Sequence, residues 1–290
     1  MQNENSVCWM NGEIIPAEQA VISVFDHGLL YGDGVFEGIR FYNGKAFRSS
    51  EHLKRLQDSA KVLNIDIPYS DATLNKAIEN LIDENGAETG YIRLIVTRGV
   101  GSLGIDPTNC HQPMVVMMAS PLSIVSVEKR QKGLRVMIAG VRRMPVDVLD
   151  PRVKSLNYLN NVMAKMQANA AGMDEAIMLN VAGNVAEGSA DNVFVVKDGI
   201  LYTPDVSCGA LEGITRNIVI DIAKDSGIAV IESRLTSYDM YNADECFLTG
   251  TGVELLPVAE VDGRKMKTCP GEMFALIEKG FHKVIQEETQ

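Results

Sequence analysis

The sequence predicts an α+β fold with two domains. A chain of 290 residues is long enough to build two modest hydrophobic cores. Strand-like and helix-like segments alternate along it, and the dipeptides Asn11-Gly12 and Asn43-Gly44 are each expected to close a hairpin. We therefore expect a small N-terminal domain at residues 1–120, a linker at 121–129 and a large domain at 130–290.

Apolar residues at intervals of three and four predict the helices. The expected helices cover 51–63, the segment from a cap at Ser70 or Asp71 to Gly86, 157–171, 214–225 and the chain after Pro270. Their apolar faces are expected to contain Leu53, Leu56, Ala60 and Leu63; Leu74, Ala77, Ile78, Leu81 and Ile82; and Met273, Phe274, Ile277, Phe281, Val284 and Ile285. Strands are expected at 91–97, 114–119, 134–140, 175–180 and 193–196.

Composition excludes several classes of function. Hydrophobic residues make up 46% of the chain and charged residues 22%, as in an ordinary globular protein. The net charge of −11 disfavours binding to nucleic acid or to anionic membranes. No apolar run approaches the ~18 residues needed to span a bilayer. The N-terminus has no signal-peptide pattern, and the five cysteines are odd in number and lack metal-binding spacing, so we expect a cytoplasmic protein without a metal.

Three kinds of side chain suggest a cofactor site. Lys154 supplies an amine, and Glu187 supplies a carboxylate just before a strand. The segment from Leu211 to Thr215 opens an amphipathic helix, whose backbone N–H groups and Thr215 hydroxyl suit a phosphate. An amine for a Schiff base, an acid for a ring nitrogen and a phosphate site together suit pyridoxal 5′-phosphate.

Six segments give the chain a family resemblance. They are FEGIRFYNG (36–44), EHLKRLQDSAK (51–61), RVKSLNY (152–158), EGSADNVF (187–194), LEGITR (211–216) and TGTGVELLPV (249–258). In this order they resemble the fold-type IV pyridoxal-phosphate aminotransferases, with the greatest likeness to branched-chain amino-acid aminotransferases. The resemblance implies a small N-terminal α/β domain, a larger C-terminal α/β-barrel-like domain, and the cofactor in the cleft between them.

The resemblance also implies roles for individual residues. Lys154 is expected to be the catalytic Schiff-base lysine, and Glu187 the partner of the pyridine nitrogen. Tyr158 is expected to donate to the cofactor O3′. The residues expected to bind the cofactor are Arg55, Lys154, Tyr158, Glu187, Leu211, Gly213, Ile214, Thr215, Gly250 and Thr251.

Substrate recognition is expected to involve a second set of residues. Tyr91 and Arg93 should share one strand face, opposite Ile92, and Phe36 should form an apolar wall. In the family, residues like Tyr31 and Leu103 reach in from the neighbouring subunit, which implies at least a homodimer. The expected substrate-binding residues are Tyr31, Phe36, Gly38, Arg40, Tyr91, Arg93, Leu103, Thr251, Gly252 and Val253.

The expected activity is ping-pong transamination of leucine, isoleucine or valine with 2-oxoglutarate. One alternative is a D-amino-acid aminotransferase, because Thr97-Arg98-Gly99 is similar to that branch; its nearby histidine is replaced here by Val100. A second alternative is an aminodeoxychorismate-type lyase of the same fold. Beyond enzymes, a protein that only stores or senses the cofactor stays open, and is tested by adding an amino acid to the purified protein.

Overall fold

The computed structural model describes residues 6–121 and 125–290, and these fall into two compact units. Of the described residues, unit 1 contains 6–121, Val153–Asn157 and Glu287–Gln290. Unit 2 contains 125–152 and Tyr158–Gln286. Unit 1 thus includes two short segments, with Lys154 in the first, that lie within the range expected for the large domain.

Unit 1 is built on a six-stranded antiparallel sheet with the order β2-β1-β6-β5-β3-β4. The strands are β1 (Val7–Met10), β2 (Glu13–Pro16), β3 (Gly34–Tyr42), β4 (Lys45–Ala46), β5 (Gly90–Thr97) and β6 (Met114–Ser120). Two-residue turns at Asn11-Gly12 and Asn43-Gly44 close the hairpins β1–β2 and β3–β4, as predicted. All four turn residues have positive φ, which is the geometry that such hairpin turns require.

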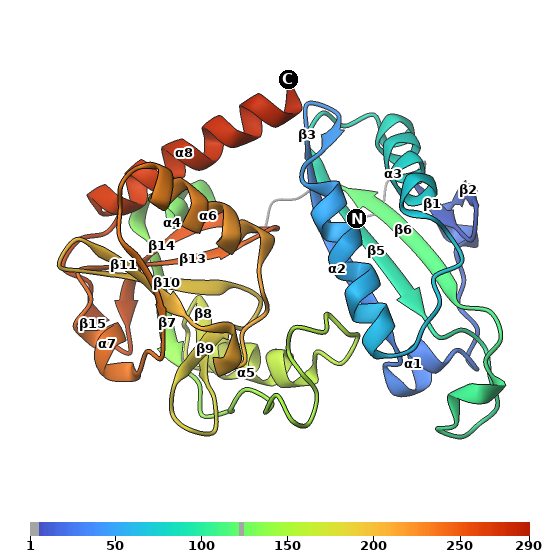
Figure 1. Ribbon diagram of the computed structural model, residues 1–290, viewed down its shortest axis with the longest axis horizontal. Helices are drawn as coiled ribbons and strands as arrows, with labels where there is room; N and C mark the ends of the chain where they lie inside the picture. The colour runs from blue at the N-terminus through green and yellow to red at the C-terminus, as the bar shows by residue number, and fades with distance from the viewer. Residues whose placement is uncertain (1–5, 122–124) are drawn as a thin grey trace. The chain divides into compact units, whose positions relative to one another are not determined.

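Two helices cover this sheet (Figure 1). Helix α2 (Ser49–Val62) packs against β3, and α3 (Asp71–Asn85) packs against β1 and β6. The predicted apolar stripe of α3 is buried, the Ser70 side chain caps the helix and Gly86 ends it in the left-handed conformation. In α2 the predicted residues Leu53, Leu56 and Ala60 are buried as well. The short helix α1 (His27–Tyr31) was not predicted.

Unit 2 is built on a nine-stranded mixed sheet. Eight strands follow the order β12-β11-β10-β13-β14-β7-β8-β9, and β15 pairs with β14. Their bounds are β7 (Leu134–Ile138), β8 (Glu175–Leu179), β9 (Val185–Gly188), β10 (Asn192–Lys197), β11 (Ile200–Pro204), β12 (Val230–Ser233), β13 (Glu245–Gly250), β14 (Glu254–Val261) and β15 (Arg264–Lys265).

Three helices of unit 2 lie close to where the sequence predicts them: α5 (Leu159–Ala170), α6 (Ile214–Asp225) and α8 (Glu272–Thr289). Two short helices, α4 (Val127–Lys132) and α7 (Ser237–Tyr241), were not predicted. On α8 the four residues Phe274, Ile277, Phe281 and Ile285 are buried, which confirms its predicted inner face. Helix α4 begins at Val127, inside the linker expected at 121–129, whose positions 122–124 lie outside the described residues.

Three 3-10 helices complete the described chain: η1 (Ala17–Gln19), η2 (Pro107–Asn109) and η3 (Val206–Cys208). Among the described residues, no helix combines the length and the apolar character needed to cross a membrane. All five cysteines lie in the described part of the chain and are free thiols.

Candidate active site

Unit 1 holds the backbone of Lys154 at both ends. Its amide donates to Ser59 Oγ on α2 at 3.1 Å, and its carbonyl accepts from the Phe36 amide on β3 at 2.9 Å. The Lys154 ammonium lies over the Phe36 ring, 4.6 Å from its centroid, in a cation–π contact. Lys154 and Phe36, both predicted as site residues, are therefore neighbours. Since hydrogen bonds hold the backbone of Lys154, only its side chain is left to move.

A buried cluster lies on the other side of β3. Glu37 has no exposed surface and accepts from Arg55 Nε at 2.7 Å, from Arg55 Nη2 at 2.9 Å and from His52 Nδ1 at 2.7 Å. Burial alone would raise the pKa of Glu37, but Arg55 and His52 outweigh it and hold that pKa well below its usual range. Burial lowers the pKa of His52, so at pH 7 this ring is neutral and donates its Nδ1–H.

The cluster affects the interpretation of Arg55. Two of its N–H groups hold Glu37, and its side chain is 14% exposed. A phosphate contact from the same guanidinium, as the sequence predicts, uses further donors of the five that arginine has. That contact stays a prediction.

The predicted substrate residues on β3 and β5 share one face of the sheet. Gly38 lies opposite Arg93, and Arg40 lies opposite Tyr91, in the β3–β5 pairing. The Arg93 guanidinium is 4.6 Å from the centroid of the Phe36 ring and 5.4 Å from that of Tyr91. Ile92 is fully buried on the opposite face, as expected from strand alternation.

Arg98 is used differently. Its Nε and Nη2 donate to the two carboxylate oxygens of Asp33, at 2.9 and 3.0 Å. It also donates to the backbone carbonyls of Leu63 and Asn64, at 2.6 and 2.7 Å. These four hydrogen bonds tie Arg98 to the framework of unit 1.

In unit 2, Glu187 lies on β9 and is buried. The sequence placed it just before a strand; in the structure it lies within β9, and its exposed fraction is only 5%. Glu187 Oε1 lies 2.8 Å from Arg143 Nη2, and Oε2 accepts from the Leu211 amide at 2.8 Å. Leu211, predicted as a cofactor residue, therefore contacts Glu187 directly.

The N-terminus of α6 begins at a glycine. Gly213 is the N-cap, and no described side chain caps the helix through a hydrogen bond. A Cβ at position 213 would lie 2.0 Å from Asn192 Oδ1, so a larger residue would displace the Asn192 side chain, whose Nδ2 donates to the Leu211 carbonyl. Thr215 is the second residue of the helix and is buried, so its hydroxyl does not act as the cap. The amides of Ile214 and Thr215 are the type of donor set that binds phosphate.

The predicted carboxylate-binding residues form the turn between β13 and β14. Gly250 pairs with Glu254, which leaves Thr251, Gly252 and Val253 in the turn. A Cβ on Gly250 would lie 2.6 Å from Asp191 Oδ1, so this backbone passes close to a neighbouring carboxylate. Tyr158, also predicted, stands at the N-cap of α5.

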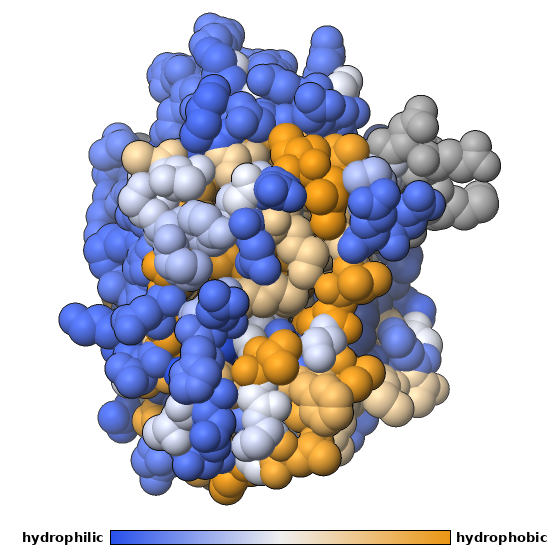
Figure 2. Space-filling model, turned by 90° about the vertical axis from the view of Figure 1, so that its right-hand side faces the viewer, coloured by the Kyte–Doolittle hydropathy of each residue, from blue (hydrophilic) through white to orange (hydrophobic). Residues whose placement is uncertain are grey.

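Tyr31 and Leu103 lie in apolar surface on unit 1, with exposed fractions of 39% and 74%. Other exposed apolar residues in the same two segments are Val21, Ile22, Val24, Phe25, Leu29, Val100 and Ile105. The segments are joined by a bridge between Asp26 and Val100. On the side drawn in Figure 2, apolar residues gather in a band between hydrophilic areas.

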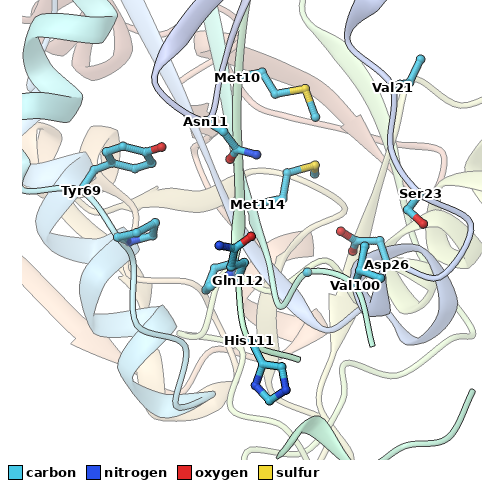
Figure 3. A pocket seen from close by; sticks show the side chains of 13 residues that line it. Met10, Asn11, Val21, Ser23, Asp26, Tyr69, Val100, His111, Gln112 and Met114 are labelled. Atoms are coloured by element: carbon cyan, nitrogen blue, oxygen red, sulfur yellow. The ribbon is translucent and has the colours of Figure 1, made fainter. Parts of the chain in front are cut away.

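A pocket of about 860 Å³ also lies in unit 1 (Figure 3). Its lining includes Asp26, Val100, His111 and Met114. None of its lining residues was predicted as a site residue. It marks where both ends of the segment 99–113 meet the sheet, and we assign it no chemistry.

Sequence reasoning missed three charged or titratable residues: Arg143, Glu37 and His52. Arg143 stands in Val141-Arg142-Arg143, which resembles an ordinary solvated loop. Alternation along β3 does carry a signal for Glu37, because it puts this acid on the same face as apolar Val35 and Ile39. A buried acid needs a partner, and basic residues of the following helix were the candidates.

Comparison with known proteins identifies the family. The family model described as amino-transferase class IV matches residues 34–261. A putative branched-chain-amino-acid aminotransferase of Methanocaldococcus jannaschii is 52% identical over 256 residues, 88% of each chain. A D-alanine aminotransferase of Listeria monocytogenes is 38% identical over 256 residues, 88% of this chain and 87% of its own.

A solved structure agrees. The branched-chain aminotransferase of the thermophilic archaeon Thermoproteus uzoniensis, crystallised with norvaline, superposes with a TM-score of 0.91. It is 36% identical, and the match covers 98% of this chain and 96% of that one. The chain belongs to the class IV aminotransferase family, and the predicted α+β fold is confirmed.

Proposed function

We propose that this protein is a pyridoxal-phosphate-dependent transaminase that moves the amino group of leucine, isoleucine or valine to 2-oxoglutarate. Family membership and the branched-chain enzymes among its relatives support this activity. The observation that carries the choice within the family is the contrast between two arginines on and after β5. Arg93 lies over Phe36 and Tyr91, whereas Arg98 is tied to Asp33.

The donor sets of the two units fit this cofactor. The uncapped amides of Ile214 and Thr215, beside a glycine that leaves no room for a Cβ, suit its phosphate. Glu187 is a buried acid held in place by Arg143, and a carboxylate at this position suits a cationic ring nitrogen. A carboxylate can accept about four hydrogen bonds, so contacts to Arg143 and Leu211 are compatible with another.

When bound, pyridoxal phosphate supplies an aldehyde that takes up an amino group and a ring that accepts electrons. Lys154 Nζ is the amine that would hold this aldehyde until a substrate amine replaces it. The freed Nζ would take the proton from the substrate α-carbon and return one to it in the reverse half-reaction. The Tyr158 hydroxyl would donate to the cofactor O3′ and so orient the ring. Arg55 and Thr251 add contacts to the phosphate.

For the substrate, we assign two functions to the predicted residues. The backbone amides of Thr251, Gly252 and Val253 bind the α-carboxylate. The β3–β5 face binds the side chain: Phe36 forms an apolar wall, and Arg93 meets the γ-carboxylate of glutamate. Gly38 and Arg40 complete this face, next to Tyr91.

The D-amino-acid branch is the second candidate, favoured by the Listeria monocytogenes relative. In that branch an arginine at the position of Arg98, just after β5, is expected to bind the substrate carboxylate. Here Arg98 donates to Asp33, Leu63 and Asn64 instead, which disfavours that role. A lyase of the same fold is the third candidate, and pyruvate formation distinguishes it.

We also propose a cytoplasmic homodimer. The exposed apolar residues of segments 21–31 and 100–105 form a surface whose contact with water is unfavourable. A second copy of the chain would cover this surface. Within the dimer, Tyr31 and Leu103 would enter the neighbouring site. Free thiols suit the reducing cytoplasm.

The experiment uses the purified protein with its cofactor. L-Leucine and 2-oxoglutarate should yield glutamate, and Lys154→Ala should abolish turnover. Borohydride reduction followed by peptide mapping should place the cofactor on Lys154. Turnover of D-alanine but not of L-leucine would favour the D-amino-acid branch. Wild-type turnover by the Lys154→Ala variant would contradict the mechanism.

A further inference from the structure

The segment between β5 and β6 is anchored to the chain just before and within α1. The His27 amide donates to the Gly99 carbonyl at 3.0 Å, and the Gly101 amide donates to the Phe25 carbonyl at 3.2 Å. Asp26 and Val100 form an antiparallel bridge between these two contacts. The first residues after β5 therefore pair with the chain around Asp26 in a short antiparallel contact, although the sequence predicts a loop there.

The His27 side chain joins both segments. It is 1% exposed, and its Nε2 lies 3.0 Å from the Ser102 carbonyl oxygen. Since a carbonyl only accepts, Nε2 must carry the hydrogen and donate it. The same ring packs edge-on against Tyr31, with ring centroids 5.0 Å apart and an interplanar angle of 88°. One buried ring thus touches Tyr31 on one side and the residue before Leu103 on the other.

The packing around this ring leaves little slack. A Cβ on Gly101 would lie 2.7 Å from His27 Nε2 and 2.4 Å from Cys110 Sγ. A Cβ on Gly99, which has φ of +91°, would lie 1.9 Å from the Gln112 carbonyl oxygen. The loop can approach His27 this closely because positions 99 and 101 are glycines.

The residues held in this way are exposed and apolar. Leu103 is 74% exposed, and Tyr31 is 39% exposed. A fixed, buried anchor beneath exposed apolar side chains presents them at a defined place instead of leaving them to move with a loop. Such pre-organisation matters when those side chains contact a ligand.

We propose that His27 is a positioning residue for substrate selection: it holds Tyr31 and Leu103 as one unit against the side chain of the amino acid bound in the neighbouring subunit. This inference rests on the proposed transaminase and its homodimer. It adds a residue that touches neither substrate nor cofactor. Its consequence is selective, because a leucine side chain extends far enough to need this wall and the methyl group of alanine does not.

The test compares His27→Phe with His27→Gln. Phenylalanine keeps the ring against Tyr31 but removes the donor to Ser102, whereas glutamine can donate again. The kcat/KM ratio of L-leucine to L-alanine should fall roughly fivefold in His27→Phe, mainly through the KM for leucine, which corresponds to one lost hydrogen bond. His27→Gln should recover most of this ratio.

Two further variants and one further readout complete the test. Gly101→Ala pushes on the same ring from the loop side and should lower the same ratio. The matched control is His111→Phe, an exposed histidine on the same loop, which should leave the ratio unchanged. Chymotrypsin should cleave after Leu103 faster in His27→Phe, because the anchor is weaker.

The outcomes separate the inference from the proposed function. Equal loss for both amino acids in His27→Phe, or unchanged cleavage at Leu103, would overturn the inference while wild-type turnover of leucine upholds the transaminase. Wild-type protein without turnover of leucine would overturn the proposed function. In that case cleavage at Leu103 still decides whether His27 anchors the loop.

Discussion

Arg143 Nη2 lies 2.8 Å from Glu187 Oε1, and the two side chains are only 8% and 6% exposed. The same guanidinium donates to Asn161 Oδ1 at 2.9 Å and to the Gly209 carbonyl at 3.1 Å, so its position is fixed from three sides. A charge held this firmly orients the Glu187 carboxyl group on β9. The carboxylate is thus prepared before any ligand arrives.

The first prediction concerns this carboxylate. Glu187→Gln keeps the shape of the side chain but removes its charge, so the cofactor ring is less readily held as a cation. We expect kcat to fall by about 100-fold or more, the range in which proton-transfer groups act. Steady-state kinetics with L-leucine and 2-oxoglutarate measures the change.

A matched control is Glu175→Gln on the neighbouring strand β8. Glu175 is another buried acid, 2.7 Å from Lys165 Nζ, and no site role is assigned to it. We expect it to lower stability by about 1–3 kcal/mol with kcat retained. Equal kcat values for the two variants would show that Glu187 has only a structural role.

The second prediction concerns the helix N-terminus of α6. Thr215→Val removes one hydroxyl and preserves the buried volume. We expect the Kd for pyridoxal phosphate to rise about tenfold, because a hydrogen bond to a charged group is lost. Equilibrium dialysis of the cofactor-free protein measures this affinity. Thr203→Val is the control: Thr203 is a buried threonine that donates to the Val193 carbonyl, and its loss should leave the Kd unchanged.

Local patterns predicted much of this fold. The Asn-Gly turns require positive φ, and the stripe of α3 follows helical spacing, so each is specified by neighbouring residues. Alternation likewise placed Tyr91 and Arg93 on one face, with Ile92 on the other. These features need no information from distant parts of the chain.

Features that depend on distant partners were missed. Glu187 can be buried because it pairs with Arg143 and accepts a hydrogen bond from the Leu211 amide. The residues next to Glu187 in the sequence do not predict either partner. The five-residue helix α1 has too few turns for a periodic pattern, although it contains His27. The roles of the site residues came from the family resemblance, because spacing alone left Lys154 as an ordinary loop lysine.

The third prediction is a pH dependence of stability. In the folded protein the pKa of Glu37 lies well below its ordinary value of about 4.3. A depressed pKa contributes stability that is complete above the ordinary value and is lost as the pH falls below it. Burial also lowers the pKa of His52. The protein therefore loses further stability on acidification, beginning near the ordinary pKa of histidine, about 6.5.

Urea unfolding from pH 7 down to about pH 2 tests this dependence with Glu37→Gln, because the loss lies below the ordinary pKa of the carboxyl group. At pH 7 the variant should lose about 3–5 kcal/mol, because Arg55 keeps a charge without its buried partner. The wild-type and variant curves should converge only below about pH 4, where the carboxylate of the unfolded chain takes up its proton. The control Glu51→Gln, on the helix α2 that also carries Arg55, removes a half-exposed acid paired with Arg48 and should cost less than about 1 kcal/mol. Parallel wild-type and Glu37→Gln curves would contradict the assignment.

The last prediction tests the substrate face of β3 and β5. A Cβ on Gly38 would lie 1.8 Å from the Tyr91 hydroxyl oxygen, so Gly38→Ala forces that side chain to move. Because Tyr91 packs beside Arg93, we expect kcat/KM for L-leucine to fall about tenfold, the effect of about 1.4 kcal/mol of lost contact. Gly140→Ala is the control, since a Cβ there meets its nearest atom at 3.6 Å. A Gly38→Ala variant with the wild-type kcat/KM for leucine would show that the substrate side chain binds elsewhere than on this face.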